Sequence, residues 1–260
     1  MSSKKIIINA VNHIESLIEE RLSDNDRMFL QRVYADGLQK YSDRLRAIDF
    51  VGMHRVLDAG CGFGQWSLAL AGLNQFVESC DISQTRANFL KALSGQLSIA
   101  NLNSQVSQIY EMPYEDNYFD AIFCYGVIFL TPWKESLAEL KRVLKPGGRI
   151  YVNANGLGWY IFLWNDEHNK SVDYDPKALA ANALSSSLNY DRSGFYVQGT
   201  SLIIEPQALK NELEANDFYE IKIAAEGCLH LNNKAPCPIP FFKGEYGGQV
   251  GIYEVVATKY

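Results

Sequence analysis

A run of glycines at residues 60–64 constrains the fold of this chain more than any other feature. The apolar residues Val56 and Leu57 and the acid Asp58 precede it, and Leu68–Ala71 follow as the start of an apolar helix. Glycine lacks a Cβ and tolerates positive φ, so such a turn can bring its backbone close to a ligand. The following helix directs unpaired N–H groups and its positive dipole end at the turn. The pattern predicts a strand, a turn that can bind a ligand and a helix, although a plain strand-to-helix turn is the alternative.

The spacing of these glycines separates the classes of ligand. A dinucleotide-binding turn has the pattern G-x-G-x-x-G/A, which would place Gly or Ala at position 65. Position 65 is Gln, and the glycines stand at 60, 62 and 64 after the acid at 58. The order D-x-G-x-G-x-G resembles motif I of the class I S-adenosylmethionine-dependent methyltransferases.

A second strand is expected at Phe76–Asp81, and it ends in an acid. A carboxylate at this strand end can accept hydrogen bonds from both hydroxyls of a ribose. The alternative role for Asp81 is to cap the helix expected over Gln84–Leu97, for which Ser83 could serve as well. Beside the glycine turn, the ribose role is the favoured interpretation.

The segment Met112–Cys124 carries the strongest part of the resemblance. Its spacing is similar to the L-P-F-x-D-x-x-F-D-x-V segment of small-molecule class I methyltransferases. In that family an acid shortly before the Pro receives the adenine amino group. Here Gln108 stands at that place, and its carbonyl can accept such a hydrogen bond, with Glu111 as the alternative. The turn at Leu144–Gly148 resembles the family's entry into its fifth strand.

The resemblance covers residues 56–153 and implies an α/β fold. That fold is a Rossmann-like, seven-stranded, mostly parallel sheet with helices on both faces. Two last strands are expected at Phe218–Ala225 and Val250–Thr258, the second of them antiparallel. We expect one methyltransferase domain over 1–260, divided into a helical N-terminal cap (1–50), a cofactor-binding core (51–153), an aromatic-rich acceptor-side insert after the fifth strand (154–204) and a C-terminal helix with the strand pair (205–260).

S-adenosyl-L-methionine is the cofactor that the resemblance implies. Asp58 would anchor its ammonium group, the glycine turn would hold its methionine end, and Asp81 would bind the ribose. Ile82 and Met112 would lie on the two faces of the adenine. The expected cofactor-binding residues are Asp58, Ala59, Gly60, Cys61, Gly62, Gly64, Asp81, Ile82, Gln108, Met112 and Tyr125.

Two helices are expected before the glycine turn, one over residues 5–22 and one from Ser23 or Asp24 to Leu45. They would form a lid over the bound ligand or pack on the edge of the sheet. Tyr34 and Tyr41 are the side chains expected to contact a ligand if the helices form a lid.

The insert after the fifth strand is dense in aromatic residues. Trp159, Tyr160, Trp164 and His168 are expected to contact the methyl acceptor, because ligands bind beyond the carboxyl ends of the strands in open α/β sheets. The alternative is that these aromatics pack the insert onto the domain. His168 is the one candidate for a general base, and no other catalytic residue is indicated. A Pro- and Gly-rich loop at 230–248 is expected near the site.

Composition narrows the class of acceptor. The net charge of −6 argues against a nucleic-acid partner, although Arg142, Lys145 and Arg149 could form a local basic patch. No apolar run is long enough to enter and cross a membrane. The five cysteines lack C-x-x-C spacing and indicate free, buried thiols in the cytoplasm. The four histidines lack the spacing of metal ligands, so no metal is expected.

Together these features predict O- or N-methylation of a small-molecule acceptor. A methyltransferase acting on RNA or protein is one alternative, and a non-catalytic cofactor-binding module is another. A sulfonium methyl group is already activated, so its transfer requires alignment and exclusion of water rather than a metal or a covalent nucleophile.

Overall fold

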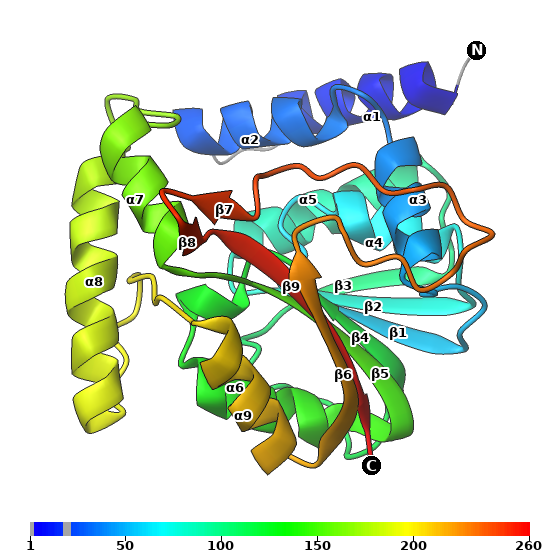
Figure 1. The fold of residues 1–260 in the computed structure, drawn as a ribbon. Coiled ribbons are helices and arrows are strands. Elements are labelled where there is room, and N and C mark those ends of the chain that lie inside the picture. Colours follow the sequence, from blue (N-terminus) through cyan, green and yellow to red (C-terminus); the bar gives the residue numbers. More distant parts are fainter. Residues whose placement is uncertain (1–2, 18–21) are drawn as a thin grey trace.

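The computed structural model describes residues 3–17 and 22–260. Its centre is a seven-stranded sheet with the order β3-β2-β1-β4-β5-β9-β6 (Figure 1). Strand β9 runs antiparallel to both of its neighbours, and the other adjacent pairs are parallel. The strands are β1 (Arg55–Ala59), β2 (Phe76–Asp81), β3 (Leu102–Val106), β4 (Phe119–Cys124), β5 (Leu144–Asn155), β6 (Phe218–Ala225) and β9 (Ile252–Lys259), and the separate pair β7 (Glu245–Tyr246) and β8 (Gln249–Val250).

Helices cover both faces of this sheet, with α4 and α5 on one side and α6 and α9 on the other (Figure 1). The helices α1 and α2 lie outside the α4–α5 layer, and α7 and α8 form the insert. The helical elements are α1 (Ser3–Leu17), α2 (Asp24–Tyr34), α3 (Gln39–Ala47), α4 (Gln65–Ala71), α5 (Gln84–Gln96), the short 3₁₀ helix η1 (Ile128–Leu130), α6 (Trp133–Val143), α7 (Leu157–Asp166), α8 (Pro176–Ser193) and α9 (Pro206–Ala215).

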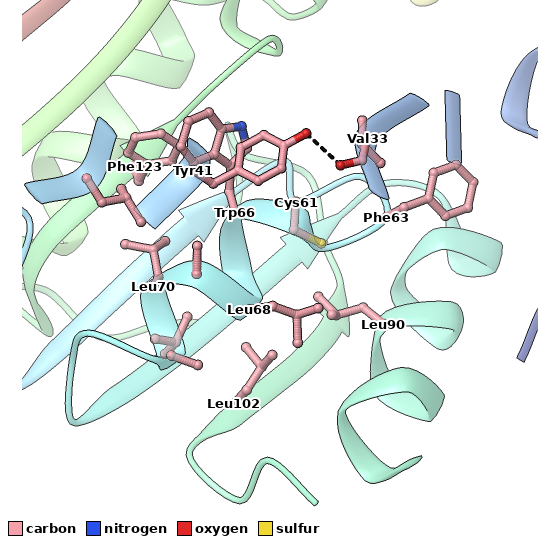
Figure 2. Packing of buried hydrophobic residues seen from close by; sticks show 14 of the residues in the cluster. Val33, Tyr41, Cys61, Phe63, Trp66, Leu68, Leu70, Leu90, Leu102 and Phe123 are labelled. Carbon is pink, nitrogen blue, oxygen red and sulfur yellow. Dashed lines mark hydrogen bonds between the residues drawn. The ribbon is translucent and has the colours of Figure 1, made fainter. Parts of the chain in front are cut away.

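The central strands are apolar on both faces, as expected for a parallel sheet covered by helices on each side. In β4, all four residues from Ala121 to Cys124 are at most 1% exposed. Two hydrophobic cores result, one on each face of the sheet. Figure 2 shows part of the first core, where Trp66 and Leu70 of α4 pack near Phe123 of β4. The Rossmann-like fold expected from the sequence is confirmed.

The N-terminal segment differs from the two helices expected. Helix α1 ends its described part at Leu17, and the expected helical residues 18–21 lie outside the described part of the chain. The helix expected from Ser23 to Leu45 is two helices, α2 and α3. Gly37 lies between them with φ +75°, a conformation that does not continue a right-handed helix. Ser23 caps α2 by accepting a hydrogen bond from the backbone N–H of Asp26.

The insert and the following loop contain elements that were not expected. Helix α7 begins two residues after β5, and α8 begins at Pro176 as expected, capped by the Asp175 carboxylate. The Pro- and Gly-rich loop expected over 230–248 contains the short strand β7, which pairs with β8. This pairing takes up Val250, so the final strand begins at Ile252 rather than at Val250.

Candidate functional site

The glycine turn joins β1 to α4 with three left-handed residues. Gly60, Gly62 and Gly64 have φ of +81°, +55° and +85°. A Cβ on Gly60 would lie 2.3 Å from a methyl carbon of Val127, and one on Gly64 would lie 2.2 Å from a methyl carbon of Leu90. The backbone therefore needs glycine at these positions for its conformation and also for close packing against the chain's own side chains.

Asp81 stands at the carboxyl end of β2, directly beside the turn. Its two carboxylate oxygens accept hydrogen bonds from the backbone N–H groups of Gly62 and Ser83, both at 2.9 Å. The Ser83 hydroxyl accepts a hydrogen bond from the Arg86 N–H and caps α5, so Asp81 is not the cap. A carboxylate has about four acceptor positions. Asp81 therefore keeps acceptor capacity for further hydroxyl groups.

Asp58 is the second acid of the site, and it lies at the end of β1. Its side chain is 1% exposed and accepts a hydrogen bond of 2.5 Å from the Ser67 hydroxyl. Burial, with a smaller contribution from the nearby Asp81 and partly offset by this hydrogen bond, raises the pKa of Asp58 to about 7. Among residues 3–17 and 22–260, no cationic side chain is paired with Asp58. A buried acid in this state is a site for an additional positive charge.

The other expected cofactor residues have different environments. Ile82 is 54% exposed next to Asp81, whereas Met112 is 6% exposed and lies in a hydrophobic core. The backbones of Gln108 and Glu111 pair in an isolated antiparallel bridge, so both stay near the carboxyl end of β3. Cys61 follows Ala59 and Gly60 in the turn, and its thiol is buried.

Helix α2 covers the glycine turn. The Tyr34 hydroxyl donates a hydrogen bond of 2.7 Å to the Phe63 carbonyl, and the Phe29 ring lies 5.8 Å from the Phe63 ring. Asp26 forms a 2.7 Å ion pair with Arg86 of α5. Of the N-terminal helices, α2 is therefore the one that lies over the turn. Tyr41 donates instead to the Val33 carbonyl and packs on α4 (Figure 2).

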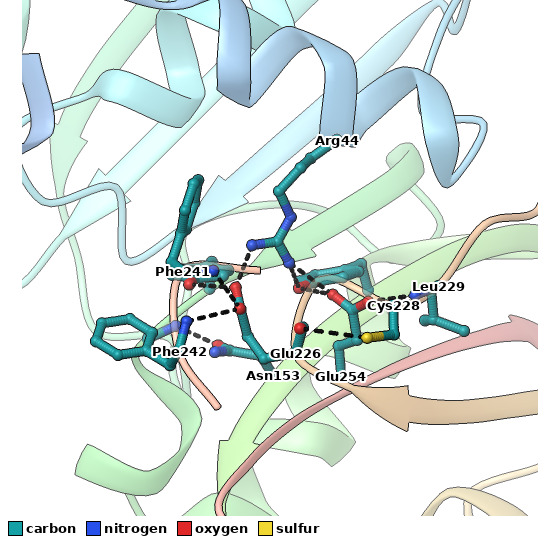
Figure 3. A network of polar contacts seen from close by, with 11 residues as sticks. Arg44, Asn153, Glu226, Cys228, Leu229, Phe241, Phe242 and Glu254 are labelled. Carbon is teal, nitrogen blue, oxygen red and sulfur yellow. Dashed lines mark hydrogen bonds and ion pairs between the residues drawn. The ribbon is translucent and has the colours of Figure 1, made fainter. Parts of the chain in front are cut away.

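A buried polar network lies beyond the end of β4 (Figure 3). Arg44 of α3 donates to both Glu226, after β6, and Glu254 of β9. All three side chains are at most 5% exposed. Tyr125, expected to face the methionine end of the cofactor, donates to Glu226 at 2.8 Å. Tyr151 likewise donates to Glu254 at 2.8 Å.

The same two carboxyl groups also bind backbone. Glu226 accepts hydrogen bonds from the N–H groups of Phe241 and Phe242, and Glu254 accepts one from Leu229 (Figure 3). Every one of these partners is a donor. The network therefore fixes the loop after β6 against α3 and the sheet. Sequence reasoning missed it, and its only local signals were a charged residue on the apolar face of α3 and an acid inside the apolar strand β9.

The four aromatic residues expected at the acceptor lie in three environments. Trp159 and His168 belong to a ring cluster with Phe162, and their own centroids are 5.9 Å apart. Tyr160 is 1% exposed, and its hydroxyl bonds to Ser201 and to the Leu202 carbonyl. The expected acceptor contact is wrong for the Tyr160 side chain, because α7 turns it into the core of the insert.

The fourth of these residues, Trp164, is 51% exposed near the end of α7. It is absent from the lining of the cavity that its neighbour Phe162 borders. That cavity has a volume of about 620 Å³ and lies between α7 and the segment from the end of β6 to β7. Its lining includes Phe162, His168, Glu226, Phe242, Lys243 and Tyr246.

The basic residues that could have formed a patch are each paired with acids. Arg142 binds Glu139 and Asp116, Lys145 binds Asp120 at 2.7 Å, and Arg149 binds Asp49. The local basic patch that the sequence left open is therefore not formed by these cations, because neighbouring carboxylates neutralise them.

The remaining expectations concern metals, membranes and thiols. No group of three or more His, Cys, Asp or Glu side chains in the described ranges is arranged to hold a metal ion. Within those ranges no helix is both long and apolar enough to span a bilayer. All five cysteines are free; Cys61, Cys80 and Cys124 are buried as expected, whereas Cys228 and Cys237 are exposed on the loop after β6.

Comparison with known proteins gives a family match inside the cofactor core. Residues 57–152 match the family model described as a methyltransferase domain. Demethylmenaquinone methyltransferase of Bacillus mycoides (strain KBAB4) is 30% identical over 112 residues, which are 42% of this chain and 47% of that protein. The chain therefore spans about half the length of the curated relatives that it matches.

Solved structures resemble a larger share of the chain. Geranyl diphosphate C-methyltransferase from Streptomyces coelicolor A3(2), in complex with Mg²⁺, geranyl diphosphate and S-adenosyl-L-homocysteine, matches with a TM-score of 0.59 and 14% identity. The match covers 93% of this chain and 86% of that one. A possible histamine N-methyltransferase from Thermotoga maritima matches with a TM-score of 0.56 and 17% identity, over 91% and 96% of the two chains. At these identities the structures establish the fold alone.

Proposed function

We propose that this chain, which belongs to the class I S-adenosylmethionine-dependent methyltransferases, transfers a methyl group from S-adenosyl-L-methionine to a small-molecule acceptor. The observation that carries the proposal is a pair of buried acids at adjacent strand ends. Asp58 lies buried and has no cationic partner among the residues that the structure describes, and the ammonium group of the cofactor would supply one. Asp81 retains acceptor positions beside the turn, which the ribose hydroxyls would use.

The cofactor would extend along the carboxyl ends of β1, β2 and β3. We assign the methionine end to Asp58, the Ala59–Gly64 turn and Tyr125, and the ribose to Asp81. The adenine would pack on the exposed Ile82 and against the segment 108–112, where Gln108 or Glu111 would meet its amino group. Met112 lies in the hydrophobic core, so it would support this surface from behind rather than cover the ring.

When bound, the cofactor supplies a methyl group that its sulfonium centre already activates. The chain's residues then have to hold the acceptor in line with that methyl group and keep water away. Helix α2, held on the turn by Tyr34, would exclude water from the cofactor side. A base is needed only if the acceptor carries a proton that must leave, and His168, which lines the cavity, would accept that proton.

We assign the acceptor to the cavity between α7 and the segment after β6. Its volume of about 620 Å³ is within the usual range of sites for small molecules. Trp159 supports the aromatic wall of the cavity from behind, and His168 lines it. The neutralised basic residues favour such an acceptor over RNA. The free thiols fit a reducing compartment, and we propose the cytoplasm.

The cofactor assignment is tested by thermal unfolding with S-adenosyl-L-homocysteine and, separately, with NAD. A ligand that binds only the native state adds about 2.7 kcal/mol of stability at a hundredfold excess over its Kd. We expect stabilisation by S-adenosyl-L-homocysteine alone, because position 65 is Gln. Equal stabilisation by NAD would overturn the proposal. Cofactor binding without transfer to any acceptor in a broad panel would favour the non-catalytic binding module.

A further inference from the structure

The wall of the acceptor cavity combines aromatic rings with buried negative charge. The Phe162 and Tyr246 rings are stacked with their centroids 4.4 Å apart, and the His168 ring lies 5.3 Å from Phe162. Phe242 is held by Trp159, at a centroid distance of 5.4 Å. The faces of aromatic rings carry negative electrostatic potential and attract cations.

The charge comes from the network of Figure 3, which reaches the cavity wall at Glu226. Glu226 accepts four hydrogen bonds and Glu254 accepts three, and every partner is a donor, which is the arrangement that suits a carboxylate. Two carboxylates share the single guanidinium of Arg44, so the charges −2 and +1 sum to −1. Charge held in a poorly solvated interior acts over a longer range than charge exposed to water.

The remaining charged groups around the cavity do not reverse this sign. Lys243 and Glu245 are both exposed on the rim and oppose each other. Near His168, Arg32 and Asp166 have opposite charges, and burial together with Arg32 lowers the pKa of the His168 imidazole, which favours its neutral form. A diphosphate would find Lys243 as the one cationic residue among those lining the cavity.

We propose that this cavity binds a cationic amine and that its nitrogen is the methyl acceptor. The inference rests on the proposed function and names its substrate class. A bound ammonium ion first gives one proton to the neutral His168 imidazole. The nitrogen lone pair then forms the N–C bond as the C–S bond breaks, its electron pair goes to sulfur, and the products are the N-methylated ammonium ion and S-adenosyl-L-homocysteine.

Choline and its uncharged carbon isostere, 3,3-dimethylbutan-1-ol, test the charge preference. Choline has no lone pair on nitrogen, so the measurement reports binding alone. Calorimetric titration should give choline at least about tenfold tighter binding than the isostere, as expected for a desolvated cation on aromatic faces. Equal binding of the two, or binding of inorganic pyrophosphate without choline, would overturn the proposal.

Substitutions at two exposed or half-exposed positions test whether choline binds in this cavity, and they leave the buried network intact. Tyr246→Leu should weaken choline binding about five- to tenfold and leave the isostere unchanged. Lys243→Gln should tighten choline binding, because it removes a positive charge at the rim that repels the cation. Phe195→Leu is the control, because this exposed ring lies outside the cavity. An equal loss in the control and in Tyr246→Leu would contradict the assignment.

Each titration is performed with and without S-adenosyl-L-homocysteine. If S-adenosyl-L-homocysteine binds and choline does not, the amine inference fails and the proposed function stands. If choline binds and S-adenosyl-L-homocysteine does not, the proposed function fails, while the cavity is still a cation site. The two failures are therefore distinguishable.

Discussion

Replacing Asp58 by asparagine should change how the stability of the protein depends on pH. In the folded protein the Asp58 carboxyl is 1% exposed, and burial raises its pKa to about 7 from an ordinary value of 3.8. Between these two values the folded state binds a proton that the unfolded state has released. Stability therefore falls as pH rises through this window and is at its lowest above pH 7.

The size of the effect follows from the shift. About three pKa units at about 1.4 kcal/mol per unit correspond to roughly 4 kcal/mol of unfolding free energy, present below pH 4 and lost by about pH 7. The carboxamide of the Asp58→Asn variant does not titrate, so this contribution should vanish from it. The buried amide group costs about 1–3 kcal/mol at every pH. The pH dependence, and not the absolute stability, is therefore the quantity to compare.

Urea unfolding of both proteins at half-unit steps from pH 4 to pH 8 measures the difference. The wild-type curve should fall relative to the Asp58→Asn curve and level off near pH 7. Ser67→Ala should move this point to higher pH, because the Ser67 hydroxyl donates to Asp58 and lowers its pKa. Saturating S-adenosyl-L-homocysteine should reduce the difference, because its ammonium group stabilises the carboxylate. Parallel curves for wild type and Asp58→Asn would refute the reasoning.

Two further variants examine the turn and its covering helix. Asp81→Ala should weaken binding of S-adenosyl-L-homocysteine by about ten- to a few-hundredfold. It also leaves the N–H groups of Gly62 and Ser83 without their acceptor, so it should cost about 2–4 kcal/mol of apo stability. Calorimetry showing an unchanged Kd would exclude the ribose role. Tyr34→Phe removes the hydrogen bond to the Phe63 carbonyl, so it should lower the free energy of unfolding by about 1 kcal/mol. It should also speed cofactor association, measured by stopped-flow mixing. An unchanged association rate would show that α2 does not control access to the cofactor site.

The cofactor core was predictable because its signals are local. The glycines at 60, 62 and 64 mark positive φ, and Asp81 is the last residue of strand β2. The strand expected at Phe76–Asp81 has the same limits in the structure. Such features depend on residues close together in the chain. Sequence order is therefore enough to place them at one edge of the sheet.

The acceptor side was harder because the direction of each side chain depends on an element that was not expected. Once α7 is a helix, the three-residue spacing places Trp159 and Phe162 together, and likewise Tyr160 and Leu163. The first pair contacts the rings around the cavity, and the second pair is buried in the insert. Aromatic content alone treats all of these residues alike, and it could not assign Tyr160 to the core.

The buried network could not be predicted from the sequence, because Arg44 lies 182 residues from Glu226 and 210 residues from Glu254. A helical pattern without homologues cannot show which distant acid meets a buried arginine. Arg44 on the apolar face of α3 and Glu254 inside β9 each contradict the apolar pattern of their surroundings. This conflict was the only indication that the positions have a purpose other than packing.

Stability does not account for this network. Replacing a buried ion pair by well-packed apolar residues often leaves protein stability unchanged or raises it. The reason is that the free-energy cost of desolvating the charges is as large as the gain from their attraction. A second carboxylate on one guanidinium adds desolvation cost without adding a cation. The arrangement does hold the backbone of Phe241 and Phe242 at the cavity wall, and it leaves one negative charge there. A site for a cation requires both properties, whereas a hydrophobic core requires neither.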